Sequence, residues 1–344
     1  MRKFTNIVAL LLAALLVLPV CAEATQLIPG GQLIGLELED QTVTIAAFDK
    51  TKSVAKEAGL LVGDRITYID DTPITCAEDI RCALTRSKGT VQIQLVRKGK
   101  NHSMAVCPQI TKDGPRLGIY LKQGISGVGT VTYYDPQTGN FGALGHSVND
   151  SSGKVLETAT GKACHAGILH IKKGLSGKPG QLMGCMDPAA YFGFIHKNTP
   201  QGIFGVSNDI PAQNPMTVAE PGQVHTGDAV IRSTVENNEV REYSVKILKI
   251  YPTARSAGRN MLLKVTDESL LSTTGGIIQG MSGSPIIQNG KLVGAVTHVL
   301  VNDPTTGYGI FIENMLDAAI NNHFLLGPKD TVSYSFLFSS GTSF

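Results

Sequence analysis

The stretch Gly280-Met-Ser-Gly-Ser-Pro285 has the residue types for nucleophilic chemistry, because it places Ser282 between two glycines. A serine hydroxyl is a weak nucleophile unless a base takes its proton and backbone amides stabilise the oxyanion on the attacked carbonyl. Glycines let the backbone turn sharply enough for the amides of one loop to point at one spot. The stretch therefore fits either a tight turn or a nucleophile. The apolar hairpin that follows, with Asn289-Gly290 as its turn, would brace either one.

A histidine that could act as the base lies upstream, where a predicted strand ends in "GALGHSVND". His146 stands between Gly145 and Ser147, so its ring is expected at the edge of a loop. A single histidine is more often structural than catalytic, and four others compete with it. Three lie in the middle of the chain and one lies in a strand just past the serine: His165, His170, His196 and His298.

The serine stretch is similar to the GDSGGP turn of chymotrypsin-like peptidases. That resemblance implies that Ser282 is the nucleophile and that the amides of Gly280 and Ser282 form the oxyanion hole. His146 upstream of Ser282 also keeps the order of histidine and serine in those enzymes. Met281 replaces the aspartate of that turn, so activation by a new N-terminus is not implied. Ser284 replaces the second glycine, and Pro285 after it holds its backbone extended.

The composition excludes several classes of function. With 42% hydrophobic and 17% charged residues, the chain is typical of a globular protein, and its 344 residues suffice for two separate cores. A formal net charge of +2 gives no electrostatic basis for a nucleic-acid partner. No His-Glu-x-x-His pair is present, and the glycine clusters lack the strand-to-helix context of a dinucleotide site. Neither a metal nor another cofactor is expected.

The elements of residues 28–108 resemble a PDZ domain. The resemblance depends on Ala58-Gly59-Leu60 and Val62-Gly63-Asp64, which are similar to the AGL-x-x-GD pattern of that family. PDZ domains bind an extended peptide beside a sheet edge, and amides of a glycine-containing loop receive its carboxylate. The loop "PGGQLIGLEL" is predicted to do so here, unless its glycines only turn the chain. The residues expected nearest the peptide are Gly30, Gly31, Ile34, Gly35 and Leu36.

Residues 115–330 contain many short predicted strands, each ended by a glycine or a turn, and few helices. They predict one or two β-barrels. The whole chain is therefore expected to be mainly β, with a PDZ domain followed by a chymotrypsin-like double β-barrel peptidase domain.

Residues 1–25 have the order of an export signal: Arg2 and Lys3, an apolar run from Ile7 to Val20, and then small residues. The run is shorter than the roughly 20 residues that span a membrane, so a cleaved signal is the first interpretation and an anchor the second. The remainder of the chain is expected outside the cytoplasmic membrane.

Three parts of the chain together resemble the stage IV sporulation protein B (SpoIVB) family of serine peptidases. They are "YDPQTGNFGALGHSVND", the block from Lys264 to Leu316, and the PDZ-like unit. The resemblance implies a peptidase exported into the space between the forespore and mother-cell membranes, where it is membrane-anchored or released. It would cleave its own N-terminal region, with residues 24–31 as the exposed site, and then cut a protein partner. That partner would regulate a membrane-embedded protease that processes a late sigma factor.

The same resemblance assigns a triad: Ser282 as nucleophile, His146 as general base and Asp267 as the acid. Asp267 lies only 15 residues before Ser282, much closer than the acid of chymotrypsin-like enzymes, and capping of the following turn is its alternative role. Asp150 and Asp228 are the reserve candidates. A peptide-binding signalling protein with an inactive peptidase fold is the alternative function. An envelope protease of the HtrA type is disfavoured because its PDZ domain follows the protease.

Overall fold

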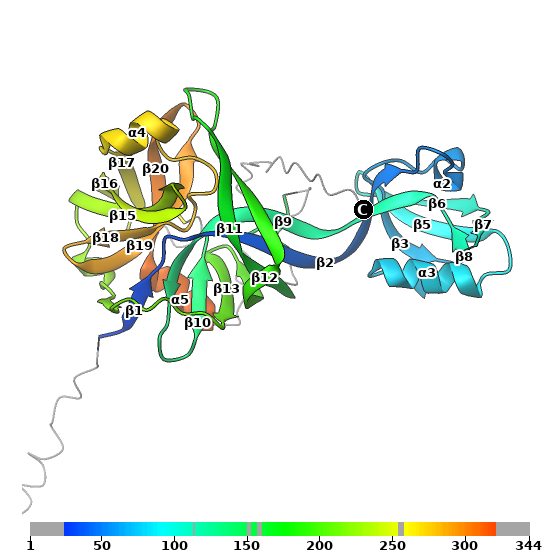
Figure 1. Cartoon of the computed structure of the whole chain (residues 1–344), viewed down its shortest axis with the longest axis horizontal. Coiled ribbons are helices and arrows are strands. Elements are labelled where there is room, and N and C mark those ends of the chain that lie inside the picture. The colour runs from blue at the N-terminus through cyan, green and yellow to red at the C-terminus, as the bar shows by residue number, and fades with distance from the viewer. Residues whose placement is uncertain (1–23, 113, 150–152, 157–159, 254–257, 321–344) are drawn as a thin grey trace, which may run out of the picture.

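The computed structural model describes residues 24–112, 114–149, 153–156, 160–253 and 258–320 (Figure 1). Most of the predicted signal at 1–25 and the end of the predicted peptidase domain, 321–330, lie outside these residues. The described chain is built mainly of β-strands, which confirms the predicted fold class. In the described residues, no helix has both the length and the apolar character needed to cross a membrane.

One barrel is made from a continuous part of the sequence. Its strands close in the order β15-β16-β17-β20-β19-β18, and neighbouring strands in the ring are antiparallel. Alternating Val, Ile and Leu side chains fill its interior. Helix α4, Glu268–Thr274, lies between β17 and β18. The strands are β15 (Gly227–Glu236), β16 (Glu239–Ile250), β17 (Met261–Val265), β18 (Pro285–Gln288), β19 (Lys291–Leu300) and β20 (Asp303–Phe311).

The other barrel is made from separated parts of the sequence. Its ring closes because β9 pairs with β10 on one side and with β2 on the other. The short strand β1 (Gln26–Pro29) pairs with β9 and with β14 (Met216–Thr217). The six strands of the ring are β2 (Leu33–Phe48), β9 (Ile119–Tyr134), β10 (Asn140–Ala143), β11 (Thr160–Lys172), β12 (Gln181–Thr199) and β13 (Gly202–Ser207). We call this the first barrel and the continuous one the second barrel.

A small unit projects from the first barrel at the far ends of β2 and β9 (Figure 1). It has its own apolar core, with Leu60, Ile66 and Ile93 among the fully buried side chains. Between the end of β2 and the start of β9 it contains α2 (Val54–Glu57), β3 (Arg65–Ile69), β4 (Thr72–Pro73), α3 (Ala77–Arg86), β5 (Val91–Arg97), β6 (Lys100–Val106), β7 (Gln109–Thr111) and β8 (Gly114–Arg116).

The AGL-x-x-GD pattern has a structural explanation in this unit. The carboxylate of Asp64 is buried and accepts a hydrogen bond from the amide of Leu61, which closes the glycine-rich turn. The guanidinium of Arg97 on β5 donates to both oxygens of Asp64, at 2.7 and 2.6 Å. The aspartate therefore ties the turn to the sheet, as the PDZ interpretation of this unit requires.

The predicted start of the PDZ unit at residue 28 is wrong. Residues 33–38 of β2 pair with Ile125–Thr130 of β9 and with β11, so they belong to the first barrel. The small unit begins at Val43, and its last strand, Ile119–Gln123, is the start of β9. It is therefore an insertion between two strands of the first barrel, because β2 and β9 each run through both units.

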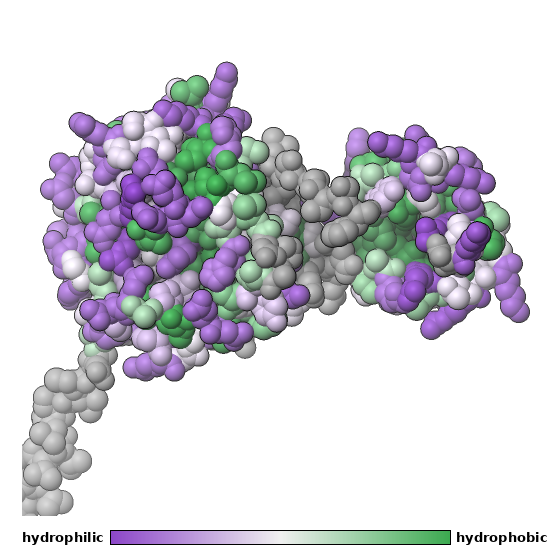
Figure 2. All heavy atoms as spheres, in the orientation of Figure 1, coloured by the Kyte–Doolittle hydropathy of each residue, from purple (hydrophilic) through white to green (hydrophobic). Residues whose placement is uncertain are grey.

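The two barrels pack through an apolar layer of their own. Leu27 and Tyr133 from the first barrel meet Leu292 and Ile310 from the second, and helix α5 (Ile312–Ile320) covers the layer. The face in Figure 2 is largely hydrophilic, and some of its hydrophobic residues lie near the β11–β12 hairpin, where Leu169 and Met183 are exposed.

Candidate active site

Ser282 lies on a loop of the second barrel, immediately before β18. Gly280 and Gly283 on either side have φ angles of +100° and +97°, which L side chains rarely adopt. Met281 is fully buried in the core of the second barrel, so its side chain holds the loop against that core. The methionine that replaces the aspartate of the GDSGGP pattern is thus an apolar anchor.

Strand β9 of the first barrel holds this loop from one side. The Thr130 hydroxyl donates to the carbonyl of Gly280 at 2.8 Å, and the Thr130 amide donates to the carbonyl of Ser282 at 2.9 Å. The Thr132 hydroxyl donates to the carbonyl of Gly283 at 2.8 Å. Both threonines are buried, so these bonds are shielded from water. They fix the position of the serine loop relative to the first barrel.

Strand β12 holds the loop from the other side. The amide of Leu182 donates to the carbonyl of Gln279 at 2.8 Å, and the amide of Gln279 donates to the carbonyl of Gly180 at 3.0 Å. A Cβ at Gly280 would lie 2.9 Å from that of Leu182, so only glycine fits there without a shift. The loop is therefore clamped by two strands of the first barrel.

The amides of Gly280 and Ser282 are free to serve an oxyanion. In the described part of the chain neither amide has a hydrogen-bond acceptor, whereas the neighbouring amides of Met281 and Gly283 are both bonded. Polar amides left open beside a nucleophile are what an oxyanion hole requires. This placement agrees with the predicted pair.

His146 follows a sharp turn at the end of β10. Leu144 and Gly145 both have left-handed backbones, with φ angles of +68° and +67°. Leu144 is buried, and such a conformation costs a residue with a side chain about 1–2 kcal/mol. A Cβ at Gly145 would come within 2.9 Å of Thr297 on β19. The strained turn thus brings His146 close to the second barrel.

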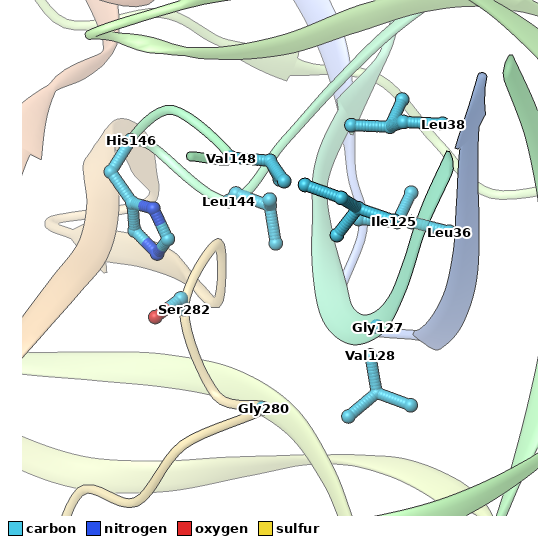
Figure 3. Close-up of a pocket in the computed structure, with 10 residues that line it drawn as sticks. All are labelled: Leu36, Leu38, Ile125, Gly127, Val128, Leu144, His146, Val148, Gly280 and Ser282. Atoms are coloured by element: carbon cyan, nitrogen blue, oxygen red, sulfur yellow. The ribbon is translucent and has the colours of Figure 1, made fainter. Parts of the chain in front are cut away.

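The imidazole of His146 points toward the side chain of Ser282 (Figure 3). Its Nδ1 atom lies 2.9 Å from the carbonyl oxygen of Ser147. Because a carbonyl can only accept, Nδ1 carries the proton in the neutral ring and Nε2 is the unprotonated nitrogen that can act as a base. Burial lowers the pKa of His146 below its usual value of 6.5, so the ring is uncharged at neutral pH. A backbone carbonyl thus fixes the tautomer that a general base needs.

The hydroxyl of Ser282 donates to the carbonyl of Thr297 at 2.9 Å in this resting state. Rotation about one side-chain bond redirects the hydroxyl toward His146, and such tightening on substrate binding is common in catalytic sites. The predicted nucleophile and base therefore lie in the same pocket, contributed by different barrels.

A second histidine, His298 on β19, lies against His146 with 5.4 Å between ring centroids. Burial, together with smaller electrostatic effects of His146 and Arg259, lowers the pKa of His298 to about 3. Its Nδ1 atom is buried and has no hydrogen-bond partner among the described residues. The guanidinium carbon of Arg259 lies 5.3 Å from the centroid of the Tyr308 ring. His298 is thus a neutral ring that packs beside the base, a contact that sequence reasoning missed because the residue reads as part of a strand.

The structure places Asp267, the predicted acid, at the start of α4 and shows no contact between it and His146 in the described residues. Asp267 is the N-cap of α4, where its carboxylate accepts from the amide of Leu270 at 2.9 Å. Its other oxygen accepts from the amide of Ser244 at 3.3 Å. The carboxylate is occupied in stabilising a helix of the second barrel, which is the alternative role considered for it from the sequence.

Of the two reserve candidates for the acid, the structure describes only Asp228. Asp228 is 92% exposed and pairs with Lys246 at 3.6 Å, so it faces solvent. Asp150 lies outside the described residues. Ser284 is fully buried and its hydroxyl bonds that of Ser233 at 3.1 Å, which leaves Ser282 as the accessible serine of the loop.

An apolar pocket opens beside Ser282 and His146 (Figure 3). Apart from these two side chains and the glycines at 127 and 280, every residue that lines it is a branched aliphatic one. They come from the paired strands β2 and β9 and from the His146 turn: Leu36, Leu38, Ile125, Val128, Leu144 and Val148.

The residues predicted to bind a peptide carboxylate are elsewhere. Gly30 and Gly31 donate to the carbonyls of Thr132 and Val131 in the first barrel, and a Cβ at Gly30 would clash with Val131. Ile34, Gly35 and Leu36 pair with β11 on one side and β9 on the other. These glycines permit close strand packing, so the prediction that the loop belongs to the PDZ unit is wrong.

The open edge of the PDZ unit lies instead at the start of β9. Ile119–Lys122 pair with β2 on one side, and within the described residues no strand pairs with the other side. Gly118 precedes this edge with a φ angle of +70°, and its carbonyl accepts a hydrogen bond from the amide of Asp49 at 3.0 Å. Leu117 and the buried face of α3 share one core.

Comparison with known proteins gives a family. The sequence profile of the SpoIVB peptidase S55 family matches residues 113–316, which is more than half of the chain. A protein of Rhizobium meliloti (strain 1021), named as a zinc metalloprotease, is 32% identical over 98 residues. That match covers 28% of this chain and only 25% of the length of the curated relative.

Two solved structures were also found to be similar. The PDZ domain of an SdrC-like protein from Listeria monocytogenes is 28% identical, with a TM-score of 0.21, over 23% of this chain and 85% of that one. The active form of the Rv3671c protease from M. tuberculosis is 16% identical, with a TM-score of 0.33, over 58% of this chain and 77% of that one.

Proposed function

This chain belongs to the SpoIVB peptidase S55 family, and from that premise we propose that it is a serine endopeptidase with Ser282 as nucleophile and His146 as general base. The observation that carries the proposal is the approach of His146 to Ser282 across the two barrels. It is supported by the hydrogen bond from Nδ1 to Ser147, which leaves Nε2 unprotonated.

The groups present supply each step of peptide-bond hydrolysis. Oγ of Ser282 attacks the substrate carbonyl carbon while Nε2 of His146 takes its proton. The amides of Gly280 and Ser282 donate to the oxyanion. His146 then gives the proton to the leaving amine, and a water molecule, deprotonated by the same nitrogen, hydrolyses the acyl-enzyme. The carbonyl of Ser147 accepts from Nδ1 and orients the ring.

The proposed biological role is more specific than the reaction itself, and we infer it from membership of the family. We place the peptidase outside the cytoplasmic membrane during endospore formation, where it cleaves itself and a regulator of a membrane-embedded protease that processes a sigma factor. We narrow the proposed site of self-cleavage to residues 24–26, which are exposed, because Leu27 and Ile28 are both buried within β1.

The test is labelling and self-cleavage of the full chain. We expect a serine-reactive phosphonate to label the wild type, and Ser282→Ala to abolish both labelling and self-trimming. Ser284→Ala is the matched control, because that hydroxyl is buried two residues away and should leave labelling intact. Equal labelling of the Ser282→Ala variant, or no labelling and no cleavage by the wild type, would contradict the proposal.

A second function, peptide binding by the PDZ unit, is favoured by the open edge at Ile119–Lys122. An added strand could pair there, and the sequence "RLGIYL" supplies a left-handed glycine at its start. Binding of a hydrophobic C-terminal peptide, measured on the Ser282→Ala chain, should be lost when Tyr120→Pro removes a strand amide. Unchanged binding would place the peptide elsewhere.

A further inference from the structure

The apolar pocket beside the nucleophile carries information about substrate. It is bounded on one side by Ser282 and His146 and on the other by the paired strands β2 and β9. A side chain that enters it must therefore come from a residue next to the bond being cut, because the reacting carbonyl has to reach Ser282 at the same time.

The register of the two strands explains why a space exists. Leu36 lies opposite Gly127, and Leu38 lies opposite Ile125. Directly paired residues of an antiparallel ladder share a face of the sheet, so these four positions form one surface. Three of them carry bulky aliphatic groups, and the fourth has no side chain. The missing side chain at Gly127 leaves room beside Leu36.

The chemistry of the walls defines the occupant. Val128, Leu144 and Val148 complete the apolar lining, and among the residues that the structure describes no charged one takes part in it. A buried charge without a partner is costly, which excludes Asp, Glu, Lys and Arg from this position of the substrate. Branched aliphatic walls match a branched aliphatic side chain in shape and polarity.

We infer that the substrate of this peptidase has an aliphatic residue, Val, Ile or Leu, directly beside the scissile bond, and that it binds in the pocket between the β2–β9 strand pair and Ser282. The inference rests on the proposed peptidase function and names the substrate class for it. Gly127 is the residue that sets the size of the side chain accepted.

The first experiment is cleavage of a peptide library in which both residues flanking one bond are varied. At one of the two positions we expect Val, Ile or Leu to exceed Ala by about tenfold in kcat/KM, and Asp or Lys by about 100-fold or more. This experiment distinguishes failure of the inference from failure of the proposed function. If peptides are cut but neither position prefers an aliphatic residue, the inference is wrong and the peptidase stands.

Two substitutions test the pocket itself. Gly127→Val fills the space, and its extended backbone accepts a side chain because its φ is not left-handed. We expect kcat/KM for the best aliphatic peptide to fall about tenfold, while the Gly or Ala peptide changes less than about twofold. The matched control, Gly89→Val, makes the same change at an exposed glycine just before β5, where no atom lies within 4 Å of an added Cβ, and should leave the profile unchanged.

A second variant tests the pocket independently, in case Gly127→Val disturbs folding. Ile125→Ala enlarges the pocket from a half-buried position and should move the preference toward Phe. Unaltered profiles in both Gly127→Val and Ile125→Ala would overturn the inference. If no peptide is cut and no phosphonate labels Ser282, the proposed function fails and the inference fails with it.

Discussion

The two barrels differ in how the sequence builds them. The second barrel uses only residues 227–311, and each of its strands pairs antiparallel with its two neighbours in the ring. The first barrel takes β1 and most of β2 from one end of the chain and its other strands from beyond the inserted PDZ unit. The second barrel supplies the nucleophile, whereas the first supplies the base, the clamp on the serine loop and the pocket wall.

This difference separates two tasks. The continuous barrel sets the local shape of the loop around Ser282, through left-handed glycines and the buried Met281. The discontinuous barrel sets where that loop lies relative to His146, through Thr130 and Thr132. A substitution that alters the shape of the serine loop can therefore be compared with one that alters its position relative to His146.

The largest effect is expected from the base. His146→Ala should lower kcat by about four to six orders of magnitude, because neither proton transfer step then has a partner. Peptide hydrolysis and melting temperature should be measured together, with His170→Ala as control because that ring is exposed on β11. Activity within tenfold of wild type would remove His146 from the mechanism.

The contact between the barrels should be weakened by any side chain added at Gly283. Its φ is +97°, and an added Cβ would overlap the Thr130 carbonyl and approach the Leu144 amide at 2.6 Å. Gly283→Ala should therefore reduce the free energy of unfolding by about 2–4 kcal/mol. Gly290→Ala separates the backbone cost from the clash, since that glycine also has a positive φ but no atom within 4 Å of an added Cβ. Equal losses for the two variants would mean that the barrel contact adds nothing.

The clamp on the serine loop is tested by Thr130→Val. The variant keeps the shape but leaves the Gly280 carbonyl without its buried donor, a change of about 1–3 kcal/mol. We expect kcat to fall about 10- to 100-fold with KM nearly unchanged. Thr132→Val, which acts one step further from the oxyanion amides, should lower kcat less. The reverse ranking would argue that the bond to Gly280 does not position the loop.

Acid should weaken the same region. His146 and His298 have folded pKa values below 6.5, with His298 at about 3, so the unfolded chain binds their protons first as pH falls. Stability is complete above pH 6.5 and is lost below it, by up to about 1.4 kcal/mol per pH unit for each histidine down to its folded pKa. Urea unfolding between pH 7 and 4 checks this, and His298→Leu should give a shallower slope. A slope that stays the same would show that His298 is not the buried titrating group.

The smallest effect is expected at Asp267. Asp267→Asn keeps a good N-cap for α4, so activity should stay within about twofold and stability within about 1 kcal/mol of wild type. A triad acid would instead cost about 10⁴-fold in kcat. Hydrolysis rates of Asp267→Asn and Asp267→Ala decide between the two, since only the alanine variant also loses the cap.

Sequence reasoning succeeded where the signal is local. The glycines around Ser282 and the turn before His146 are readable because backbone conformation is a property of neighbouring residues. The role of Asp267 was also readable, since an aspartate directly before Glu-Ser-Leu-Leu is typical of a helix N-cap. The family resemblance instead suggested the triad.

Long-range pairing escaped the sequence. Gly30 and Gly31 have the composition of a carboxylate-binding loop, and only the pairing of β1 and β2 with β9 shows that they pack against Val131. Thr130 and Thr132 read simply as residues with high β propensity. Their hydroxyl partners lie about 150 positions away in the chain, which no local pattern encodes.

The course of β2 and β9 has a consequence for how this protein is assembled. Leu38 pairs with Ile125, and Val43 pairs with Gln123, so the PDZ unit occupies the place of a hairpin turn between two adjacent strands. Its entry and exit points are neighbours, and closing them with a short turn costs little chain entropy. We therefore expect that the unit can be removed or replaced whole by joining two strand ends, while the rest of β2 and β9 continues to line the pocket.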